Sequence, residues 1–143
     1  MKLVQHLLDT KGREIHSVAA ETSVLDAIIQ MAQKSIGSLL VMEGDELKGI
    51  LTERDYARKV IVKGRSSKTT EVGEIMSTEV LTTTPVETVN QCMTTMTEKK
   101  IRHLPVVDGG KVVGLISIGD LVQAIISDQQ EEIHHLEQYI SGQ

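Results

Sequence analysis

Apolar residues recur at helical spacing in the first third of the chain. Val24, Ala27, Ile28 and Met31 follow the i, i+3, i+4, i+7 spacing of one helix face, directly after Ser23, which is a favourable N-cap residue. This pattern predicts an amphipathic helix with one buried face.

Two short aliphatic segments follow this helix, at residues 39–42 and 47–51. A polar turn that contains Gly44 separates them, so the pattern predicts a β-hairpin. A second helix is expected to begin at Thr52 and to run to about Val62.

The same pattern returns 65 positions further along the chain, without gaps. A helical stripe spans residues 89–96, aliphatic strands are expected at 104–107 and 112–116, and a helix is expected to begin at Ser117. A chance match would not keep glycines, aliphatic residues and an acid in register, so the chain is a tandem duplication. The identical pairs include Val24/Val89, Met31/Met96, Leu39/Leu104, Gly49/Gly114 and Asp55/Asp120.

The duplication predicts three parts: a first repeat with an N-terminal lead-in (1–64), a linker with the second repeat (65–126), and a C-terminal helix and tail (127–143). Each repeat reads as strand, helix, strand, strand, helix. A repeat of about 60 residues makes only a marginal core, and a lone hairpin leaves one face uncovered. We therefore expect an α+β protein whose pseudo-symmetric repeats pack sheet to sheet, with a ligand cleft between the halves.

The composition excludes several classes of function. The chain has 143 residues, 40% hydrophobic and 24% charged, and a net charge of −5, which argues against general affinity for nucleic acid. Trp and Phe are absent and only two Tyr are present, so stacking platforms for bases or sugars are scarce. A single Cys and an N-terminus unlike a signal peptide favour the cytoplasm. No apolar run is long enough to span a membrane.

The candidate chemistry lies where the second strand of each hairpin ends. Thr52 is followed three positions later by Asp55, and Ser117 is followed in the same way by Asp120, each in what should be an exposed helical turn. One interpretation is a capping box that closes the helix start. The other is a ligand site, in which the hydroxyl and helix N-terminus accept a phosphate and the acid binds ribose hydroxyls. The two interpretations are compatible.

Basic residues strengthen the ligand interpretation. Arg54, Arg58 and Lys59 crowd the helix that follows Thr52, in an otherwise acidic chain. Arg102 and His103 lie at the entrance of the second hairpin, although a solvated turn or a surface ion pair would also explain them.

The C-terminal segment has an apolar stripe outside the repeats. Ile126, Ile133 and Ile140 are seven residues apart, with Leu136 between them. The stripe fits either a helix docked on its own domain or a contact between two copies of the chain.

The remaining candidate residues give little indication of a functional site. Cys92 aligns with Ala27 on the buried stripe and is expected to fill the core. His134 and His135 are adjacent and would point in different directions on a helix, so no metal site is expected. No phosphate loop and no nucleophile motif is present, so the chain is not expected to be an enzyme.

The whole chain resembles a pair of cystathionine-β-synthase (CBS) domains, also called a Bateman module. The likeness covers residues 4–126. It is carried by Ile36–Val41, Gly49–Arg58, Glu74–Met76, Ile101–Val107 and Gly114–Asp120. The resemblance implies a regulatory module that binds an adenosine compound, AMP or NAD(H) in particular, and that acts as a homodimer on an unidentified effector protein.

The resemblance also implies two clefts, each of which draws on both repeats, with Asp55 and Asp120 on ribose and the hydroxyls of Thr52 and Ser117 near phosphate. The first cleft would use Thr52, Asp55, Arg58, Thr82, Thr84, Val86, Arg102, His103 and Leu104. The second would use Val18, Gly37, Ser38, Leu39, Ile116, Ser117 and Asp120. The second has fewer cations, since Gly37 and Ser38 stand where the first has Arg102 and His103.

Two functions follow from these observations. The leading one is a sensor of adenine nucleotides. The alternative is a structural dimerisation or adaptor module whose clefts are vestigial. An enzyme has no support in the sequence.

Overall fold

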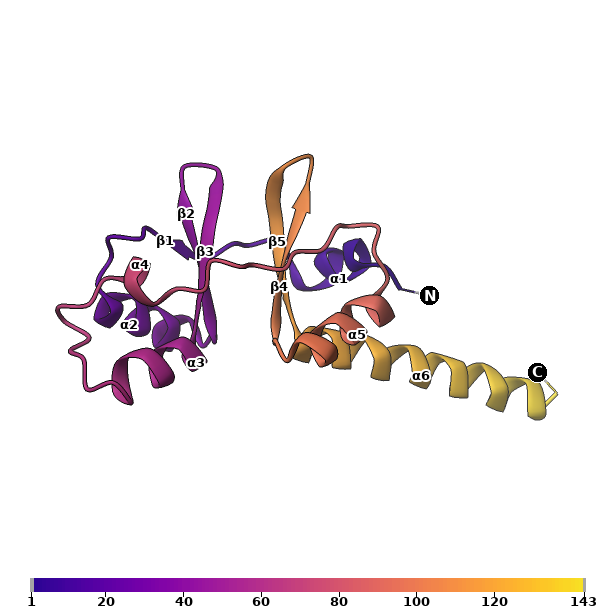
Figure 1. Cartoon of the computed structure of the whole chain (residues 1–143). Helices are drawn as coiled ribbons and strands as arrows, with labels where there is room; N and C mark the ends of the chain where they lie inside the picture. Colours follow the sequence, from indigo (N-terminus) through magenta and orange to yellow (C-terminus); the bar gives the residue numbers. More distant parts are fainter. Residues whose placement is uncertain (1, 143) are drawn as a thin grey trace. The chain divides into compact units, whose positions relative to one another are not determined.

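Two repeats of helix and hairpin make up most of the chain (Figure 1). The structure is a computed structural model and describes residues 2–142. It divides into two compact units, each with its own hydrophobic core. The first-repeat unit is built mainly from residues 14–81. The second-repeat unit is built mainly from the residues up to 13, residues 82–108 and the residues from 113 onward.

The first-repeat unit holds a three-stranded sheet in the order β1-β2-β3. β1 runs parallel to β2, and β2 and β3 form the predicted antiparallel hairpin. Its elements are β1 (Ser17–Val18), α2 (Val24–Lys34), β2 (Ser38–Glu43), β3 (Glu46–Thr52), α3 (Glu53–Tyr56), the π-helix η1 (Ala57–Ile61) and α4 (Val72–Ile75).

The second-repeat unit repeats this plan around the hairpin of β4 and β5. Thr83 forms an isolated parallel bridge with Val106, in the place that β1 takes in the first repeat. Its elements are α1 (Val4–Lys11), α5 (Val89–Lys99), β4 (His103–Asp108), β5 (Lys111–Ser117) and α6 (Ile118–Ile140).

The ends of the central helices confirm the duplication in atomic detail. The Ser23 hydroxyl accepts a hydrogen bond from the backbone of Asp26, and Thr88 caps α5 in the same way. Both helices end on a left-handed residue, Ser35 at φ 55° and Lys100 at φ 56°. Since L-residues rarely adopt this conformation, its recurrence shows that the two repeats share a backbone design as well as a sequence pattern.

The short helix before each repeat completes the core of the other repeat. Val4 and Leu8 of α1 are buried among the core residues of the second repeat. Val72 and Ile75 of α4 are buried in the core of the first. The division expected from the sequence assigned 1–13 to the first repeat and 65–81 to the second. The structure groups them the other way, because their apolar side chains fill the opposite core.

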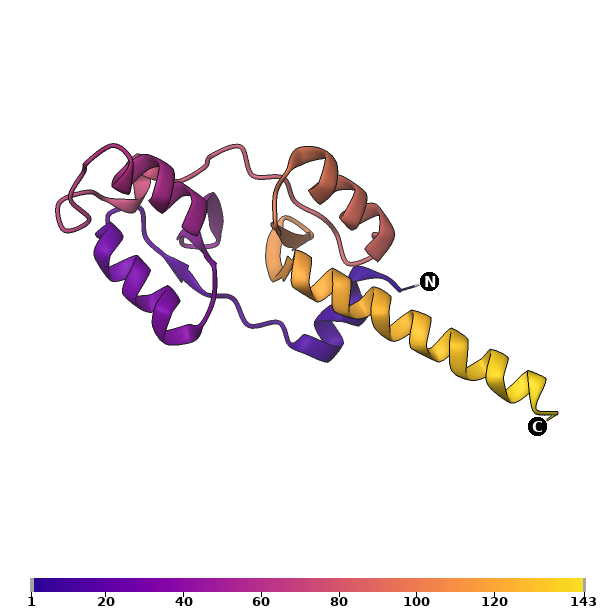
Figure 2. The ribbon, with the colours of Figure 1, turned by 90° about the horizontal axis from the view of Figure 1, so that it is seen from below.

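The helices after the two hairpins differ from each other. The first begins after Thr52 as expected, but it passes from α3 into the π-helix η1 before ending near Val62. The second, α6, continues for 23 residues without a break where a separate C-terminal helix was expected to start. Its last turns extend beyond the rest of the second-repeat unit (Figure 2). Across residues 2–142, no helix has the length and apolar character needed to cross a membrane.

The α+β class, the two repeats and the C-terminal helix are therefore confirmed. Cys92 is buried in the second core, as expected, with its Sγ 3.3 Å from the Thr83 hydroxyl. Burial raises the pKa of its thiol, so it is a poor nucleophile.

Candidate functional site

Both strand-to-helix junctions form the predicted capping box. The backbone N–H of Asp55 donates to the Thr52 hydroxyl at 3.2 Å, and the Asp55 carboxylate accepts from the Thr52 N–H at 3.0 Å. Ser117 and Asp120 repeat this exchange at 3.3 and 2.8 Å. The two acids are thus held at equivalent positions, each just beyond the end of a hairpin strand.

Asp55 lies deeper than the sequence indicated, with only 6% of its surface exposed. Its Oδ1 atom accepts a hydrogen bond from the Ser77 hydroxyl at 3.1 Å and lies 3.1 Å from the Lys59 ammonium. Its Oδ2 atom accepts from both the N–H and the hydroxyl of Thr52. The expectation of an exposed acid is therefore wrong, because the segment around Ser77 bridges to Ile50 of β3 and covers the carboxylate.

Asp120 has a different cationic partner. The Lys11 ammonium, at the end of α1, lies 2.7 Å from its Oδ2 atom and also donates to the Leu115 carbonyl at 2.7 Å. Burial opposes ionisation of Asp120, but the hydrogen bonds from Lys11 and from the Ser117 backbone outweigh it and hold the pKa of this carboxyl below its usual range. Asp120 is half-buried and ionised at neutral pH.

In the first-repeat unit, Gly37, Ser38 and Thr52 lie together at the open end of the hairpin, where β3 leads into α3. Ser38 is paired with Thr52 across the hairpin, and the Gly37 carbonyl accepts a hydrogen bond from the Glu53 N–H at 3.2 Å. Leu39 is next in the strand and is fully buried. Val18 pairs with Val41 on the other side of β2. Arg58 is on η1 and is exposed.

The second-repeat unit has the same arrangement with different side chains. The Arg102 carbonyl accepts from the Ile118 N–H at 2.9 Å, as Gly37 does from Glu53 in the first repeat. The side chain of Arg102 is exposed and that of His103 is half-buried. Leu104 and Ile116 are buried in the hydrophobic core. These residues frame the start of α6, where Ser117 and Asp120 lie.

The segment before α5 places its side chains alternately. Thr83 is buried, while Thr82, Thr84 and Val86 are exposed. The Thr83 backbone pairs with β4 through its N–H to the Pro105 carbonyl at 2.9 Å and its carbonyl to the Val107 N–H at 2.8 Å. The two flanking hydroxyls therefore stand on the exposed face of an extended segment that is held in place by β4.

The predicted residues thus form one group in each unit. The first group is Val18, Gly37, Ser38, Leu39, Thr52, Asp55 and Arg58. The second is Thr82, Thr84, Val86, Arg102, His103, Leu104, Ile116, Ser117 and Asp120. Their combination into two clefts stays a prediction from the resemblance.

Three partners of the acids were not anticipated: Lys59, Ser77 and Lys11. Lys59 is four residues after Asp55 on the same helical segment, a spacing that marks an ion pair in the sequence. Ser77 and Lys11 reach their acids from other elements, 22 and 109 residues away in the chain. No local pattern identifies such contacts.

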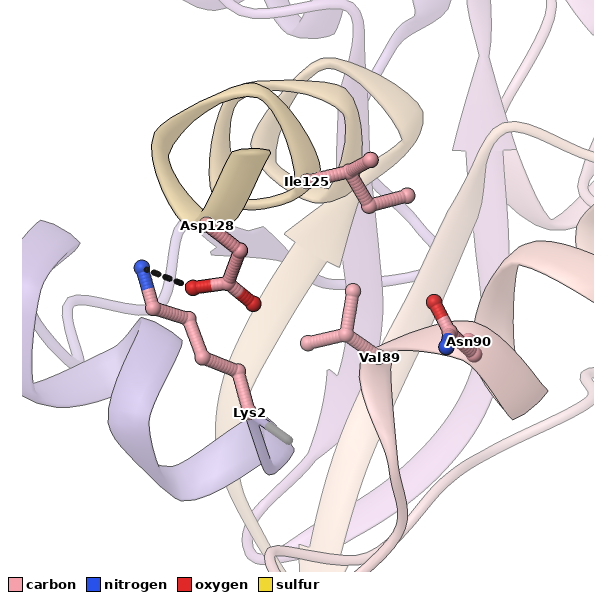
Figure 3. A pocket seen from close by; sticks show the side chains of 5 residues that line it. All are labelled: Lys2, Val89, Asn90, Ile125 and Asp128. Atoms are coloured by element: carbon pink, nitrogen blue, oxygen red, sulfur yellow. Dashed lines mark ion pairs between the residues drawn. The ribbon is translucent and has the colours of Figure 1, made fainter. Parts of the chain in front are cut away.

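A small pocket of about 100 Å³ opens in the second-repeat unit, lined by Lys2, Val89, Asn90, Ile125 and Asp128 (Figure 3). Lys2 and Asp128 form an ion pair at 3.2 Å on one side of it. Pockets that enclose small organic ligands measure roughly 300–1,000 Å³. This pocket is therefore too small for a nucleotide, and it contains none of the predicted site residues.

The described residues include no cluster of three or more His, Cys, Asp or Glu side chains that would hold a metal ion. His134 and His135 are exposed on α6, with ring centroids 6.5 Å apart. The polar groups at the two strand ends are hydroxyls, carboxylates and main-chain amides. This set is suited to the hydroxyl groups of an organic ligand.

The sequence profile of the CBS domain matches residues 10–62 and 72–127. The chain belongs to the CBS domain family. The mitochondrial CBS domain-containing protein CBSX3 of Arabidopsis thaliana is 45% identical over 148 residues, covering 97% of this chain and 72% of that protein.

Solved CBS structures match the fold as well. A signal-transduction protein with CBS domains from Burkholderia ambifaria is 53% identical, with a TM-score of 0.87, covering 90% of this chain and 96% of that one. The CBS domain pair of protein MJ0100, solved in complex with 5′-methylthioadenosine and S-adenosyl-L-methionine, is 25% identical, with a TM-score of 0.79. The alignment covers 90% of this chain and 98% of that one. The identification as a tandem CBS pair is confirmed.

Proposed function

We propose that this CBS pair is a regulatory module that binds an adenine nucleotide of the AMP or NAD(H) type and acts as a homodimer, and that it is not an enzyme. The observation that carries the proposal is the duplicated acid held by a capping box at a strand end, Thr52 with Asp55 and Ser117 with Asp120. The adenosine compounds in the CBS pair of MJ0100 support the ligand class.

The acids bind the ribose in this proposal. A carboxylate accepts two hydrogen bonds from vicinal hydroxyls, and the capping box already fixes its orientation. Thr52 and Ser117 place a hydroxyl at the N-terminus of a helix, where a phosphate is favoured. Aliphatic side chains and main-chain groups hold the adenine, since the chain has no Trp or Phe to stack on it.

Ligand binding exchanges one set of hydrogen bonds for another. Ribose hydroxyls on Asp55 replace the Ser77 hydroxyl and the Lys59 ammonium, which occupy Oδ1 in this structure. On Asp120 they displace Lys11, which ends α1. Occupancy thus changes the segments that precede the two repeats, and this change is the signal that we propose is passed to an effector protein in the cytoplasm.

The cations select the ligand. Arg102 and Arg58 are exposed and offer charge-assisted hydrogen bonds to a phosphate. The sequence has no phosphate loop of the kind that cradles a magnesium–triphosphate. We therefore expect AMP and NAD(H) to bind more tightly than ATP, and to prefer the first predicted cleft, in which Arg102 and His103 join Thr52, Asp55 and Arg58.

A structural module with vestigial clefts is the second candidate. The observation that favours it is that both acids already have protein partners, so neither needs a ligand to satisfy its oxygens. In that case the capping boxes and ion pairs serve only to join the helices to the hairpins.

Thermal unfolding in the presence of AMP, NAD, NADH, ATP and S-adenosylmethionine separates the two candidates. A ligand at 100 times its dissociation constant adds about 2.7 kcal/mol to the free energy of unfolding. We expect a concentration-dependent rise in Tm with AMP and NAD(H). No shift with any compound would reject the sensor and favour the structural module.

A further inference from the structure

An ammonium group lies beside each of the two acids, although the duplication does not supply it. Lys59 of η1 lies 3.1 Å from Oδ1 of Asp55, and Lys11 of α1 lies 2.7 Å from Oδ2 of Asp120. In the register of 65 residues, Lys59 corresponds to Ala124, which is buried and carries no charge. The two repeats therefore obtain the same charge beside the same carboxylate from different elements.

An additional helical turn brings Lys11 to its acid. The N–H of Val4 donates to the Glu87 carbonyl at 2.9 Å. The N–H of Val72 makes the equivalent bond to the Thr22 carbonyl, at 2.8 Å, so α1 and α4 begin at equivalent places. However, α4 has four residues and α1 has eight. The last turn of α1, which α4 lacks, ends at Lys11 and carries its ammonium to the start of α6.

The Lys11 ammonium belongs to the polar group where β5 leads into α6. It donates to the Leu115 carbonyl at 2.7 Å and to Oδ2 of Asp120, which also accepts from the Ser117 N–H at 2.8 Å. The Lys11 side chain is 36% exposed, and the stem of a lysine is long and flexible. The ammonium can therefore leave the carboxylate while the strand and the helix keep their places.

We infer that Lys11 selects phosphorylated ligands at this site by changing its partner. The inference rests on the proposed function, in which ribose hydroxyls displace Lys11 from Asp120. The same ribose carries the phosphate on its 5′ carbon, so the released ammonium finds a new anion within the span of one sugar. A nucleotide thus replaces the carboxylate that Lys11 loses, whereas a nucleoside leaves the ammonium without an anionic partner.

This role differs from that of a purely structural ion pair. If Lys11 only held α1 against the second hairpin, its removal would change the affinities for nucleoside and nucleotide by the same factor. If it changes partner, its removal takes away a competitor for the acid and also takes away a group that binds phosphate. The affinity for adenosine should then stay or rise, and the affinity for AMP should fall.

Site-specific titration of the full chain by NMR tests the inference, with AMP and adenosine as the two ligands. The amide signals of Ser117 and Asp120 report binding at this site separately from binding at the first-repeat acid. The variant Lys11→Met keeps the length of the side chain, and Lys11→Arg keeps its charge. Lys2→Met is the matched control, because it removes another ion pair of the same unit, between Lys2 and Asp128 (Figure 3).

We expect Lys11→Met to weaken AMP binding roughly tenfold and to leave adenosine binding equal or up to about threefold tighter. Lys11→Arg and Lys2→Met should keep the preference of the wild type for AMP. If AMP affinity does not fall relative to adenosine in Lys11→Met, or falls as much in Lys2→Met, the inference is overturned and the nucleotide site remains. If neither ligand shifts these amides in the wild type, the proposed function fails at this site and the inference fails with it.

Discussion

The two repeats hold the same acid in the same capping box, yet they surround it differently. Asp55 is covered by the chain segment that contains Ser77 and has a partner on both of its oxygens. Asp120 is half-buried and is paired with Lys11 from α1. A local motif was therefore duplicated faithfully, while its surroundings were set by whichever segment packs against it. The difference indicates that the two acids contribute unequally to stability and can respond differently to a ligand.

We expect the largest difference in stability from substitution of the glycine in the second strand of each hairpin, Gly49 in β3 and Gly114 in β5. A Cβ atom at Gly49 would lie 2.8 Å from the Ser77 carbonyl oxygen, whereas one at Gly114 would lie 2.6 Å from Cδ2 of the Leu8 side chain. Backbone yields less easily than the end of a side chain. We expect Gly49→Ala to lower the free energy of unfolding by about 3 kcal/mol and Gly114→Ala by about 1 kcal/mol. Urea unfolding of both variants measures this, and equal losses would show that the segment at Ser77 is not rigidly held.

Substitution of Asp55 or Asp120 by Ala should give a second, smaller difference in the free energy of unfolding. Asp55→Ala removes the acceptor of the Ser77 and Thr52 hydroxyls and leaves these half-buried donors without it, so we expect a loss of about 2–3 kcal/mol. Asp120→Ala removes a helix cap and a partly exposed ion pair, for which we expect about 1 kcal/mol. Chemical denaturation at neutral pH provides both values. If Asp120→Ala were the more damaging change, burial would not govern the contribution of these acids.

Removal of the Lys11–Asp120 ion pair should give the smallest loss of stability, and this loss should depend on pH. Since the pKa of Asp120 is lowered by folding, its ionisation stabilises the fold above the unfolded pKa of about 3.9, and this contribution is lost as the pH falls through the lower folded value. Lys11→Met should cost about 0.5–1 kcal/mol at pH 7 and progressively less below about pH 4. The exposed Lys68 provides the control, Lys68→Met. A loss that persists at acid pH would assign the effect of Lys11 to its packing.

The repeats, hairpins and caps were predictable because each depends on residues close together in the sequence. Ser23 and Thr52 cap helices through partners three residues away, and the hairpin turns need only a few residues of their own. The exchange of α1 and α4 between the two cores was not predictable. Both helices are short and amphipathic, and only tertiary packing decides which core their apolar side chains enter.

The candidate site shows the same division between local and distant contacts. The Thr52–Asp55 pair was visible in the sequence, but the burial of Asp55 was not, because it depends on Ser77 from a segment beyond η1. The apolar stripe of α6 was visible as a pattern, but only the structure shows that Ile133 and Ile140 are open to solvent and not docked on the second-repeat unit. Contact of this stripe with a second copy of the chain stays a prediction.

The central claim is that this CBS pair is a nucleotide sensor. Its most direct test is isothermal titration of AMP and of adenosine into the wild type and into Arg102→Ala. Arg102 is exposed, so its removal should leave the fold intact, with the Tm as a check. The account predicts saturable binding of AMP to wild type, weakened roughly tenfold or more by Arg102→Ala, with adenosine nearly unaffected. Absence of binding to wild type, or equal weakening of AMP and adenosine, would contradict it.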